Sequence, residues 1–578
     1  MTKTKKKEQK EKKVLRIIPL GGLHEVGKNM TLLEYGDDML IIDCGMTFPT
    51  TDMLGIDCVI PDFTYLRDKA DKIKGLVLTH SHEDHIGGVP FFLKEFNVPI
   101  YASPLTQGFL KFKFKEHKIT EYNFHDLVPG QQINLGCFKI EAIHVTHSVA
   151  DSMALIIDTP VGRIFHTGDF KFDHTPIDDN PTDILRIAQI GQKGVLLLMS
   201  DSTNAVREGF SESEKVIKAN FETIFKKNTH RFIITTFSSN VHRVQSIFDL
   251  AYENNRKVAV TGRSMENMIK VASDLGYLNI PPNTLITLKQ AKLYKNSELV
   301  ILTTGSQGEA ASALTRIAYG QHKDIKITSD DVVILSSSIV PGNELGVYDL
   351  INKIMSMGAQ VIYSEVADVH ASGHAKKEEL KLMLALIKPK YFMPVHGEIR
   401  LLVSHSELAQ EMGIDKNKIV IAENGSVVEL TSRKFKLTGD TVQAGAILVD
   451  GLGIGDVGAK VLSERKALSE GGLIVLAAVF DDSQRIVSDI QLYTKGLIYV
   501  KEYGQVLDKA RAVLYNALDD AYAQKKNKDQ IKELLETTLT IIIRLKALGI
   551  LVAHHGGALL PEDGIAALPL GADVKTPA

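Results

Sequence analysis

His80-Ser81-His82-Glu83-Asp84-His85 is the stretch of this sequence that decides its fold. The apolar run 75–79 precedes it and Gly87-Gly88 follows it closely, so three histidines and an aspartate stand at the end of a predicted buried strand. Imidazole nitrogens and carboxylate oxygens clustered in this way can bind one divalent ion and contribute to a second. Core packing does not require this pattern, and a solvated loop with chance histidines explains it poorly. The stretch therefore predicts a metal site on a strand-to-helix loop.

Length and composition indicate a multidomain globular chain. With 578 residues the chain exceeds one hydrophobic core and should hold roughly three or four domains. A net charge of -3 gives no global basicity, so any polyanion site must be local. Three unpatterned cysteines fit a reducing compartment, and the sequence shows neither a membrane-length apolar run nor a signal-peptide core. We expect a cytoplasmic protein with no membrane partner.

Three later strands end in residues of the same ligand types. One ends at His147, one leads into a tight turn before Asp169, and one ends at His396. An imidazole from His147 could complete the first metal's ligands, and His396 could do the same for the second. Asp169 could bridge both ions and offset part of their charge.

Three other polar residues near these strand ends have two interpretations each. His144 and His166 lie earlier on their strands, and we interpret them as packed or supporting histidines rather than ligands. Asp43 ends an early strand, where its carboxylate either supports the neighbouring metal loop or caps a turn. The sequence does not decide between these two roles of Asp43.

Between about residues 207 and 390 the sequence alternates helices and strands, which predicts a parallel sheet with helices on both faces. The loops at the strand ends are small and polar, and most of them open a helix. Free backbone amides at a helix N-terminus form an anion site, although one such loop is usually only a cap. Several at one sheet edge favour a phosphate-bearing substrate. They are 238–240, 262–264, 303–308, 336–338 and 371–374.

Two further patterns need a choice between alternatives. Phe and Lys interleave over 111–118, as on some nucleic-acid surfaces, but an amphipathic element with its Phe side buried explains the pattern better. Gly453–Gly458 satisfies the G-x-G-x-x-G spacing of dinucleotide sites, with Asp481 further along. Nothing around it repeats a βαβ pattern, so we favour a linker.

Taken together, these residues resemble the metallo-β-lactamase superfamily, and the helix–strand insertion resembles the β-CASP domain of its nucleic-acid-processing members. The ribonuclease J family is the most similar. The resemblance implies an α/β chain: an αββα sandwich with an inserted β-CASP α/β domain and a small α+β C-terminal domain. The sequence from His554 onward departs from the family pattern. The matching stretches include 25–29, 167–173, 200–204, 262–265, 304–309, 370–375 and 394–398.

The resemblance also implies roles for single residues. His80, His82 and His147 would bind one zinc, Asp84, His85 and His396 the other, and Asp169 would bridge them, with manganese as the alternative metal. Asp84, Asp201 and His374 would be catalytic, His374 lying at a helix start. The positions that would hold substrate phosphates are Ser238, Ser239, Asn240, His370, Ser372, Gly373, His374 and Ala375.

The expected domains follow the same resemblance. Residues 14–206 and 369–448 would form the two parts of the metallo-β-lactamase domain, with the β-CASP domain at 207–368. A linker at 449–464 and a small domain at 465–553 would follow. Residues 1–13 and 554–578 would be tails, the first basic.

The resemblance implies a metal-dependent ribonuclease that digests 5'-monophosphorylated, single-stranded RNA from 5' to 3', with endonuclease activity in addition. Its context would be mRNA decay and rRNA maturation, as a homodimer or homotetramer, with other RNA-decay proteins or the ribosome as further partners. The alternatives are a DNA-processing nuclease of the same superfamily and a non-catalytic RNA-binding scaffold. A small-molecule hydrolase would not need the large insertion.

Overall fold

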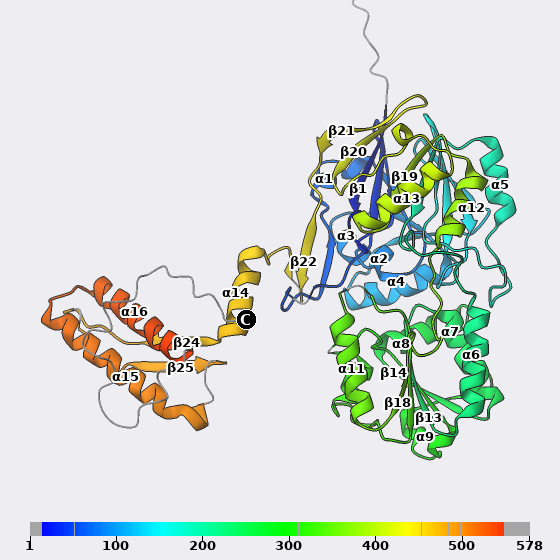
Figure 1. Cartoon of the computed structure of the whole chain (residues 1–578). Coiled ribbons are helices and arrows are strands. Elements are labelled where there is room, and N and C mark those ends of the chain that lie inside the picture. The colour runs from blue at the N-terminus through cyan, green and yellow to red at the C-terminus, as the bar shows by residue number, and fades with distance from the viewer. Residues whose placement is uncertain are drawn as a thin grey trace, which may run out of the picture. The chain divides into compact units, whose positions relative to one another are not determined.

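The computed structural model describes residues 14–50, 52–309, 311–340, 342–451, 453–483, 485–496 and 500–547, the last range without the side chains of 500–506 and 542–547. The expected tails at 1–13 and 554–578 lie outside these residues. The chain divides into two compact units, Met1–Val457 and Gly458–Ala578 (Figure 1). None of the helices in the described ranges is long and apolar enough to cross a membrane.

Two facing sheets form the centre of the first unit. One has the described order β21-β20-β1-β2-β3-β5-β6-β7, and the other has the order β19-β12-β11-β10-β9-β8. The strands of the first are β1 Leu15–Gly21, β2 Met30–Tyr35, β3 Asp38–Ile42, β5 Ile73–Val77, β6 Pro99–Ala102, β7 Asn123–Asp126, β20 Ser426–Leu430 and β21 Phe435–Thr441. Those of the second are β8 Gln132–Leu135, β9 Phe138–His144, β10 Met153–Thr159, β11 Gly162–His166, β12 Leu197–Asp201 and β19 Tyr391–Val395.

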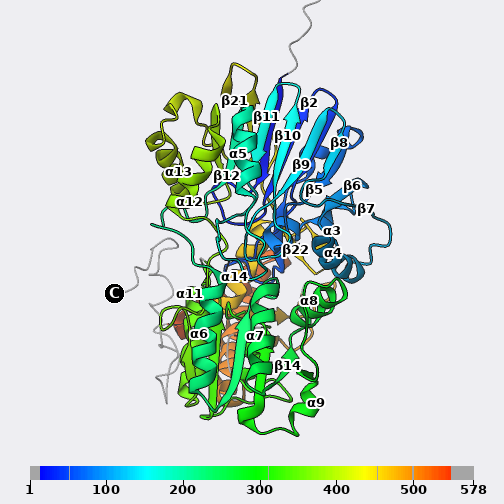
Figure 2. The same cartoon turned by 90° about the vertical axis from the view of Figure 1, so that its right-hand side faces the viewer.

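Both faces of these sheets are apolar because both are covered. In β3, Leu40 and Ile42 enter the core between the sheets, whereas Met39 and Ile41 pack outward against helices. This period-two alternation with apolar residues on both sides is what a sheet buried on both faces requires. The result is the expected αββα sandwich (Figure 2). Its outer helices are α1 Thr64–Arg67, α2 Glu83–Ile86, α3 Val89–Phe92 and α4 Pro104–Glu116 on one face, and α5 Ile184–Lys193, α12 Lys377–Ile387 and α13 Ile399–Glu411 on the other.

The segment between β12 and β19 forms a parallel sheet of its own, as predicted. Its described order is β15-β14-β16-β13-β17-β18, and every pair is parallel. Phe232 and Ile234 face one helical layer and Ile233 faces the other. The strands are β13 Arg231–Thr236, β14 Lys257–Thr261, β15 Leu285–Ile286, β16 Leu299–Thr303, β17 Asp331–Ser336 and β18 Gln360–Ile362. The helices are α6 Glu214–Lys227, α7 Val241–Glu253, α8 Arg263–Asp274, α9 Leu288–Ala291, α10 Ala313–Ala318 and α11 Glu344–Ser356.

The inserted domain packs directly on the sandwich through α4 and α8. A Cβ added at Gly108 would lie 2.5 Å from Val271 Cγ1, so glycine permits the close approach.

Phe114 of α4 is 1% exposed while Lys111 and Lys115 are exposed. The interleaved Phe and Lys pattern therefore belongs to an amphipathic helix.

The Gly-rich sequence after residue 450 is not a dinucleotide site. Here β22 (Ala446–Asp450) pairs antiparallel with β4 (Cys58–Pro61) and with β23 (Gly453–Ile454), so the parallel βαβ unit of such a site is missing from these residues. The predicted linker is partly helical, because α14 spans Ala459–Gly471.

The second unit is a small α+β module, as expected. Its hairpin consists of β24 (Leu473–Ala477) and β25 (Gln491–Lys495), paired antiparallel. The helices α15 (Val500–Ala523) and α16 (Lys528–Ala547) pack on one another, and Leu514 and Ile531 belong to their shared core with Leu492.

Candidate metal centre

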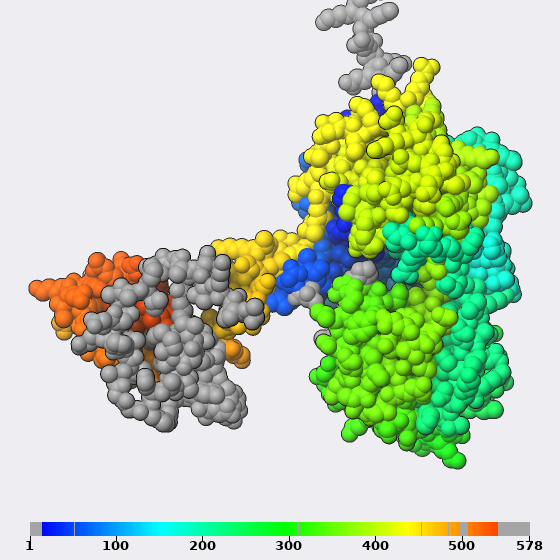
Figure 3. Space-filling view, viewed as in Figure 1, coloured from blue at the N-terminus to red at the C-terminus, as the bar shows by residue number. Residues whose placement is uncertain are grey.

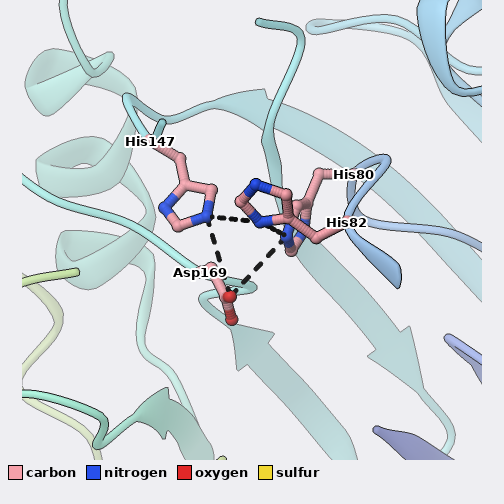
Figure 4. Close-up of side chains that lie close together, drawn as sticks. All are labelled: His80, His82, His147 and Asp169. Carbon is pink, nitrogen blue, oxygen red and sulfur yellow. Dashed lines mark hydrogen bonds and ion pairs between the residues drawn. The ribbon is translucent and has the colours of Figure 1, made fainter. Parts of the chain in front are cut away.

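The predicted ligands come from separate strand ends and meet at one edge of the sandwich. His80 and His82 follow β5, His147 follows β9, Asp169 follows β11 and His396 follows β19. Figure 4 shows His80, His82 and His147 around the carboxylate of Asp169. The fold therefore gathers side chains that are far apart in sequence.

Three imidazoles form the first half of the centre. Nδ1 of His82 lies 3.1 Å from Nε2 of His80 and 3.0 Å from Nε2 of His147. Oδ2 of Asp169 lies 3.6 Å from the same nitrogen of His80. Burial lowers the pKa of His82 to about 4 and holds the pKa values of His80 and His147 well below their usual range. These rings are neutral at neutral pH, the form that binds metals.

The second half consists of Asp84, His85 and His396, which lie beside the same carboxylate of Asp169. Nε2 of His85 lies 3.2 Å from Oδ2 of Asp169, and Nε2 of His396 lies 3.3 Å from Oδ2 of Asp84. Burial alone would lower the pKa of His396, yet the Asp169 carboxylate raises it to about 10. The same opposition between burial and Asp169 raises the pKa of His85 well above its usual value. Protons on these two rings would balance the carboxylates whenever no metal is bound.

Two buried atoms show that the cluster fits a cation. Oδ2 of Asp169 and Nε2 of His396 make no regular hydrogen bond within the described residues and face charged groups of the cluster instead, His85 at 3.2 Å and Asp84 at 3.3 Å. A buried polar atom without a regular hydrogen bond is rare in a folded chain. The four ligand-type atoms of each half lie within 4.8 Å of one another, and Asp169 belongs to both halves. The donor set, nitrogen and carboxylate oxygen, suits zinc and similar divalent ions.

Asp43 supports the metal loop, which settles the question that the sequence left open. Its Oδ2 accepts a hydrogen bond from Nδ1 of His85 at 2.7 Å, and its Oδ1 accepts from the Thr79 amide at 2.8 Å. The contact leaves Nε2 of His85 directed to the centre. Asn29 adds a contact that sequence reasoning missed, because its Nδ2 lies 3.2 Å from that nitrogen.

His166 shapes the turn that projects Asp169. Its Nδ1 accepts a hydrogen bond from the Gly168 amide at 3.0 Å, and Gly168 has a φ of 56°. Glycine adopts this left-handed conformation without strain, and a Cβ at this position would lie 2.7 Å from the Met153 carbonyl oxygen. His166 therefore supports the site as we predicted, and His144, which faces the Asn180 carbonyl at 2.9 Å, lies outside it.

His374 and Asp201 form a pair beside the metal ligands. Nδ1 of His374 donates to Oδ2 of Asp201 at 2.8 Å, and Thr203 holds the other carboxylate oxygen at 2.7 Å. Burial would lower the pKa of His374, but Asp201 and Asp169 raise it. The prediction that His374 opens a helix is wrong. His374 lies in the loop before α12, which begins at Lys377.

The loop that carries His374 also positions His147. Nδ1 of His147 donates to the Gly373 carbonyl at 2.6 Å, which leaves its Nε2 for the centre. A Cβ at Gly373 would lie 2.6 Å from this ring, so a larger residue would displace it. Asn204 holds the loop through Oγ of Ser372 at 2.8 Å and the His374 carbonyl at 3.0 Å.

The predicted phosphate-binding residues lie in two loops with different environments. Ser238 and Ser239 are half-buried at the end of β13. Asn240 is 2% exposed, and its side chain accepts from the Arg243 amide at 3.0 Å as the cap of α7. His370 and Ser372 are half-buried, whereas Gly373 and Ala375 are buried.

Buried charges connect these loops, and no local pattern in the sequence indicates them. Arg243 is 1% exposed and donates to Glu214 at 3.0 Å, to the Ser336 carbonyl at 3.0 Å and to the Val369 carbonyl at 3.3 Å. Burial would raise the pKa of Glu214, but Arg243 lowers it to about 2. Arg243 thus ties α7 to the segment that precedes His370.

Comparisons with known proteins agree with this geometry. Family models described as Metallo-beta-lactamase superfamily and Ribonuclease J, beta-CASP domain, match residues 25–207 and 229–354. Those described as Zn-dependent metallo-hydrolase RNA specificity domain and Ribonuclease J C-terminal domain match 359–421 and 460–546. Ribonuclease J of Synechocystis sp. is 46% identical over 487 residues, which cover 84% of this chain and 76% of that protein. The chain belongs to the ribonuclease J family.

Further relatives extend the comparison. Ribonuclease J 1 of Streptococcus pyogenes is 44% identical over 515 residues, 89% of this chain and 91% of that protein. A crystal structure of an Enterococcus faecalis protein of unknown function shares the fold, with a TM-score of 0.50 at 16% identity over 72% of this chain and all of that one. For a ribonuclease J family member, the metallo-β-lactamase superfamily implies divalent metal ions, and the clustered ligands fit them.

Replacing Asp43 should weaken metal binding. In Asp43→Asn one of the two acceptor oxygens becomes an NH2 group, so either Nδ1 of His85 or the Thr79 amide loses its acceptor and the support of His85 weakens. Loss of such a supporting contact typically costs roughly 10–100-fold in metal affinity. Asparagine tolerates the positive φ of 60° at this position. Competition with a coloured zinc chelator measures the affinity. Asp37→Asn, at a carboxylate that is 85% exposed, is the control. Unchanged affinity in Asp43→Asn would show that the contact does not support the centre.

Metal binding should release protons. His85 and His396 have raised pKa values in the absence of ions, so about two protons per chain must leave when both halves fill. Acidification should therefore weaken binding, because protons compete with the ions. Titration calorimetry in buffers of different ionisation enthalpy counts the protons, and His396→Ala should release about one fewer. Binding that releases no protons, or that tightens at lower pH, would contradict these charge states.

Proposed function

We propose that this chain hydrolyses RNA phosphodiester bonds at the centre built on Asp169, with zinc as the first candidate for both ions and manganese as the second. The observation that carries the proposal is that both ligand groups share this one buried carboxylate, with His80 and His85 near its Oδ2 and His396 near its Oδ1. The RNA specificity domain match at 359–421 and the names of the relatives support RNA as the substrate.

Most of the chemistry belongs to residues of this chain. When bound, the ions would lower the pKa of a water molecule towards ~7 and offset charge on the phosphoryl oxygens. His80, His82 and His147 offer neutral nitrogens to one ion. Asp84, His85 and His396 would hold the other, and the buried carboxylate of Asp169 would keep the two close together.

His374 is the residue that would act on the substrate. Its Nδ1 is fixed by Asp201 at 2.8 Å, so its Nε2 is the atom available to RNA. Because its pKa is raised, the His374 ring stays protonated at a higher pH than a free histidine does. As water oxygen bonds to phosphorus and the bond to the ribose oxygen breaks, this ring would either give the leaving oxygen a proton or donate a hydrogen bond to the phosphoryl group.

Polar loops of the inserted domain and of the segment that follows it would hold the 5' end. Ser238, Ser239 and Ser372 have half-buried hydroxyls, and backbone amides at the start of α7 add donors for phosphate. A 5'-monophosphate held there would set the next phosphodiester at the metals, which gives 5'-to-3' digestion with internal cuts as a second mode. We place this activity in cytoplasmic mRNA decay and rRNA maturation, in a homodimer or homotetramer.

A time course with labelled RNA tests the function. Single-stranded RNA labelled at either end, with a 5'-monophosphate or a 5'-triphosphate, is incubated with the protein and each divalent metal. We expect 5'-labelled mononucleotide first from the monophosphate, and slower digestion of the triphosphate. Asp84→Ala should abolish cleavage while RNA binding persists. Glu83→Gln is the matched control, because this neighbouring carboxylate pairs with Lys113 at 2.6 Å.

Three results would overturn parts of the proposal. Retained turnover in Asp84→Ala would remove the second ion from the mechanism. Equal cleavage of a DNA strand of the same sequence would favour a DNA-processing nuclease, because metal and phosphate contacts do not read the 2'-hydroxyl. RNA binding without any cleavage in the wild type would indicate a scaffold.

A further inference from the structure

A cationic pocket lies on the metallo-β-lactamase domain away from the metal centre. It is open, with a volume of about 530 Å³. Its basic residues come from the start of β19, from the short helix Lys416–Lys418 and from the hairpin of β20 and β21. Because the whole chain carries a net charge of -3, this concentration of positive charge is local. The cations are Lys390, Lys418, Arg433, Lys434 and Lys436.

The hairpin turn holds part of this pocket in a fixed shape. The Thr431 amide donates to the Lys434 carbonyl at 2.8 Å, and Oγ of Thr431 accepts from the amides of Arg433 and Lys434 at 3.3 and 2.9 Å. Nζ of Lys390 donates to the Ser432 carbonyl at 2.7 Å. This contact joins the start of β19 to the turn, so basic residues distant in sequence stay together.

Carboxylates neutralise only part of the charge. Lys418 pairs with Asp415 at 3.1 Å and Lys436 lies 3.7 Å from Glu429. In the part of the chain that the structure describes, no ion pair reaches Lys390, Arg433 or Lys434. Three unneutralised cations around one pocket attract a polyanion more strongly than lysines scattered over a surface.

The floor of the pocket shows which part of a nucleic acid it fits. The rings of Tyr391 and Phe435 lie 5.3 Å apart, and each residue is 6% exposed. Proteins that bind single strands stack bases on exposed aromatic rings. The rings of Tyr391 and Phe435 are too deeply buried to do so. The accessible groups are ammonium and guanidinium, which contact phosphates and carry no sequence information.

The length of one strand, β19, separates the pocket from the candidate metal centre. β19 begins at Tyr391 beside the pocket, and His396 follows its other end. Five residues at ~3.3 Å each span roughly 16 Å. Figures 1 and 2 both place the β20–β21 hairpin at the end of the first unit that lies away from the inserted domain. In Figure 3 the yellow region that includes the hairpin lies on the surface at the top of the first unit.

We propose that this pocket is an accessory site for the phosphodiester backbone of RNA, which it holds outside the catalytic cleft. The inference rests on the proposed function for its substrate class. An RNA long enough to reach both places gains affinity from Lys390, Arg433 and Lys434. A short RNA that occupies only the metal centre gains none.

Salt-dependent binding tests the pocket without catalysis. Arg433→Ala/Lys434→Ala is compared with the wild type by fluorescence anisotropy of a labelled RNA of about 30 nucleotides, on the full chain in chelator, over a range of KCl concentrations. The slope of log Kd against log salt should fall in magnitude by about 1.4, because each lost phosphate contact on a single strand removes about 0.7. Lys289→Ala/Lys326→Ala removes two exposed cations of the inserted domain and should leave the slope unchanged.

The outcomes separate this site from the proposed function. Turnover of a dinucleotide by the metal-loaded protein should be equal in the wild type and the pocket variant, because two nucleotides at ~3.4 Å each do not reach from the metal centre to the pocket. An unchanged slope in the pocket variant, or an equal fall in the control, overturns the site whether or not the wild type cleaves RNA. Binding of polyglutamate, an acidic polypeptide, is measured in the same two proteins. If the pocket variant binds RNA as the wild type does but loses polyglutamate binding, the RNA site is overturned in favour of an acidic protein partner. If the slope falls in the pocket variant and the wild type cleaves no RNA, the pocket is supported and the proposed function is rejected.

Discussion

One buried carboxylate must serve imidazoles on two sides, and the architecture of the first unit depends on this constraint. Asp169 is 2% exposed, and its Oδ2 lies 3.6 Å from His80 Nε2 and 3.2 Å from His85 Nε2. A carboxylate so deeply buried is costly unless positive charge faces it. In the absence of ions, His396 and His85 hold the pKa of Asp169 well below its usual range against the opposing effect of burial. The same charge balance makes the place suitable for divalent cations.

The chain that returns after the inserted domain supplies part of the site, because β19 rejoins the sandwich sheet beside β12. β12 and β19 pair in parallel, with Asp201 opposite Val395, although the whole β-CASP segment separates them in sequence. This register sets His396 beside Asp201, whose Oδ1 lies 3.7 Å from its Nδ1. The returning chain also brings Gly373 against His147 and His374 against Asp201. One strand pairing thus helps to position two predicted metal ligands, His396 and His147, and the proposed proton donor His374.

Residues at strand ends could be predicted from the sequence, because strand patterning is local and the carboxyl ends of neighbouring strands share an edge. His147, Asp169 and His396 reached one place for this reason. Long-range side-chain contacts could not be predicted. The role of Asp43 depends on His85, which lies in α2, and the Arg243–Glu214 pair has no periodic signature. Asn240 matched a phosphate-binding pattern, but a helix cap has the same local sequence, and its side chain is used there.

The number of ions that Asp169 holds tests the central claim most directly. Metal content per chain, measured by mass spectrometry after dialysis against zinc and then against metal-free buffer, should be about two in the wild type, since both halves of the cluster offer zinc ligands. Asp169→Ala should lose both ions, whereas His147→Ala should lose the first and keep the second. An Asp169→Ala protein that retains a full complement of ions would contradict the shared carboxylate, and so would a wild type that binds only one.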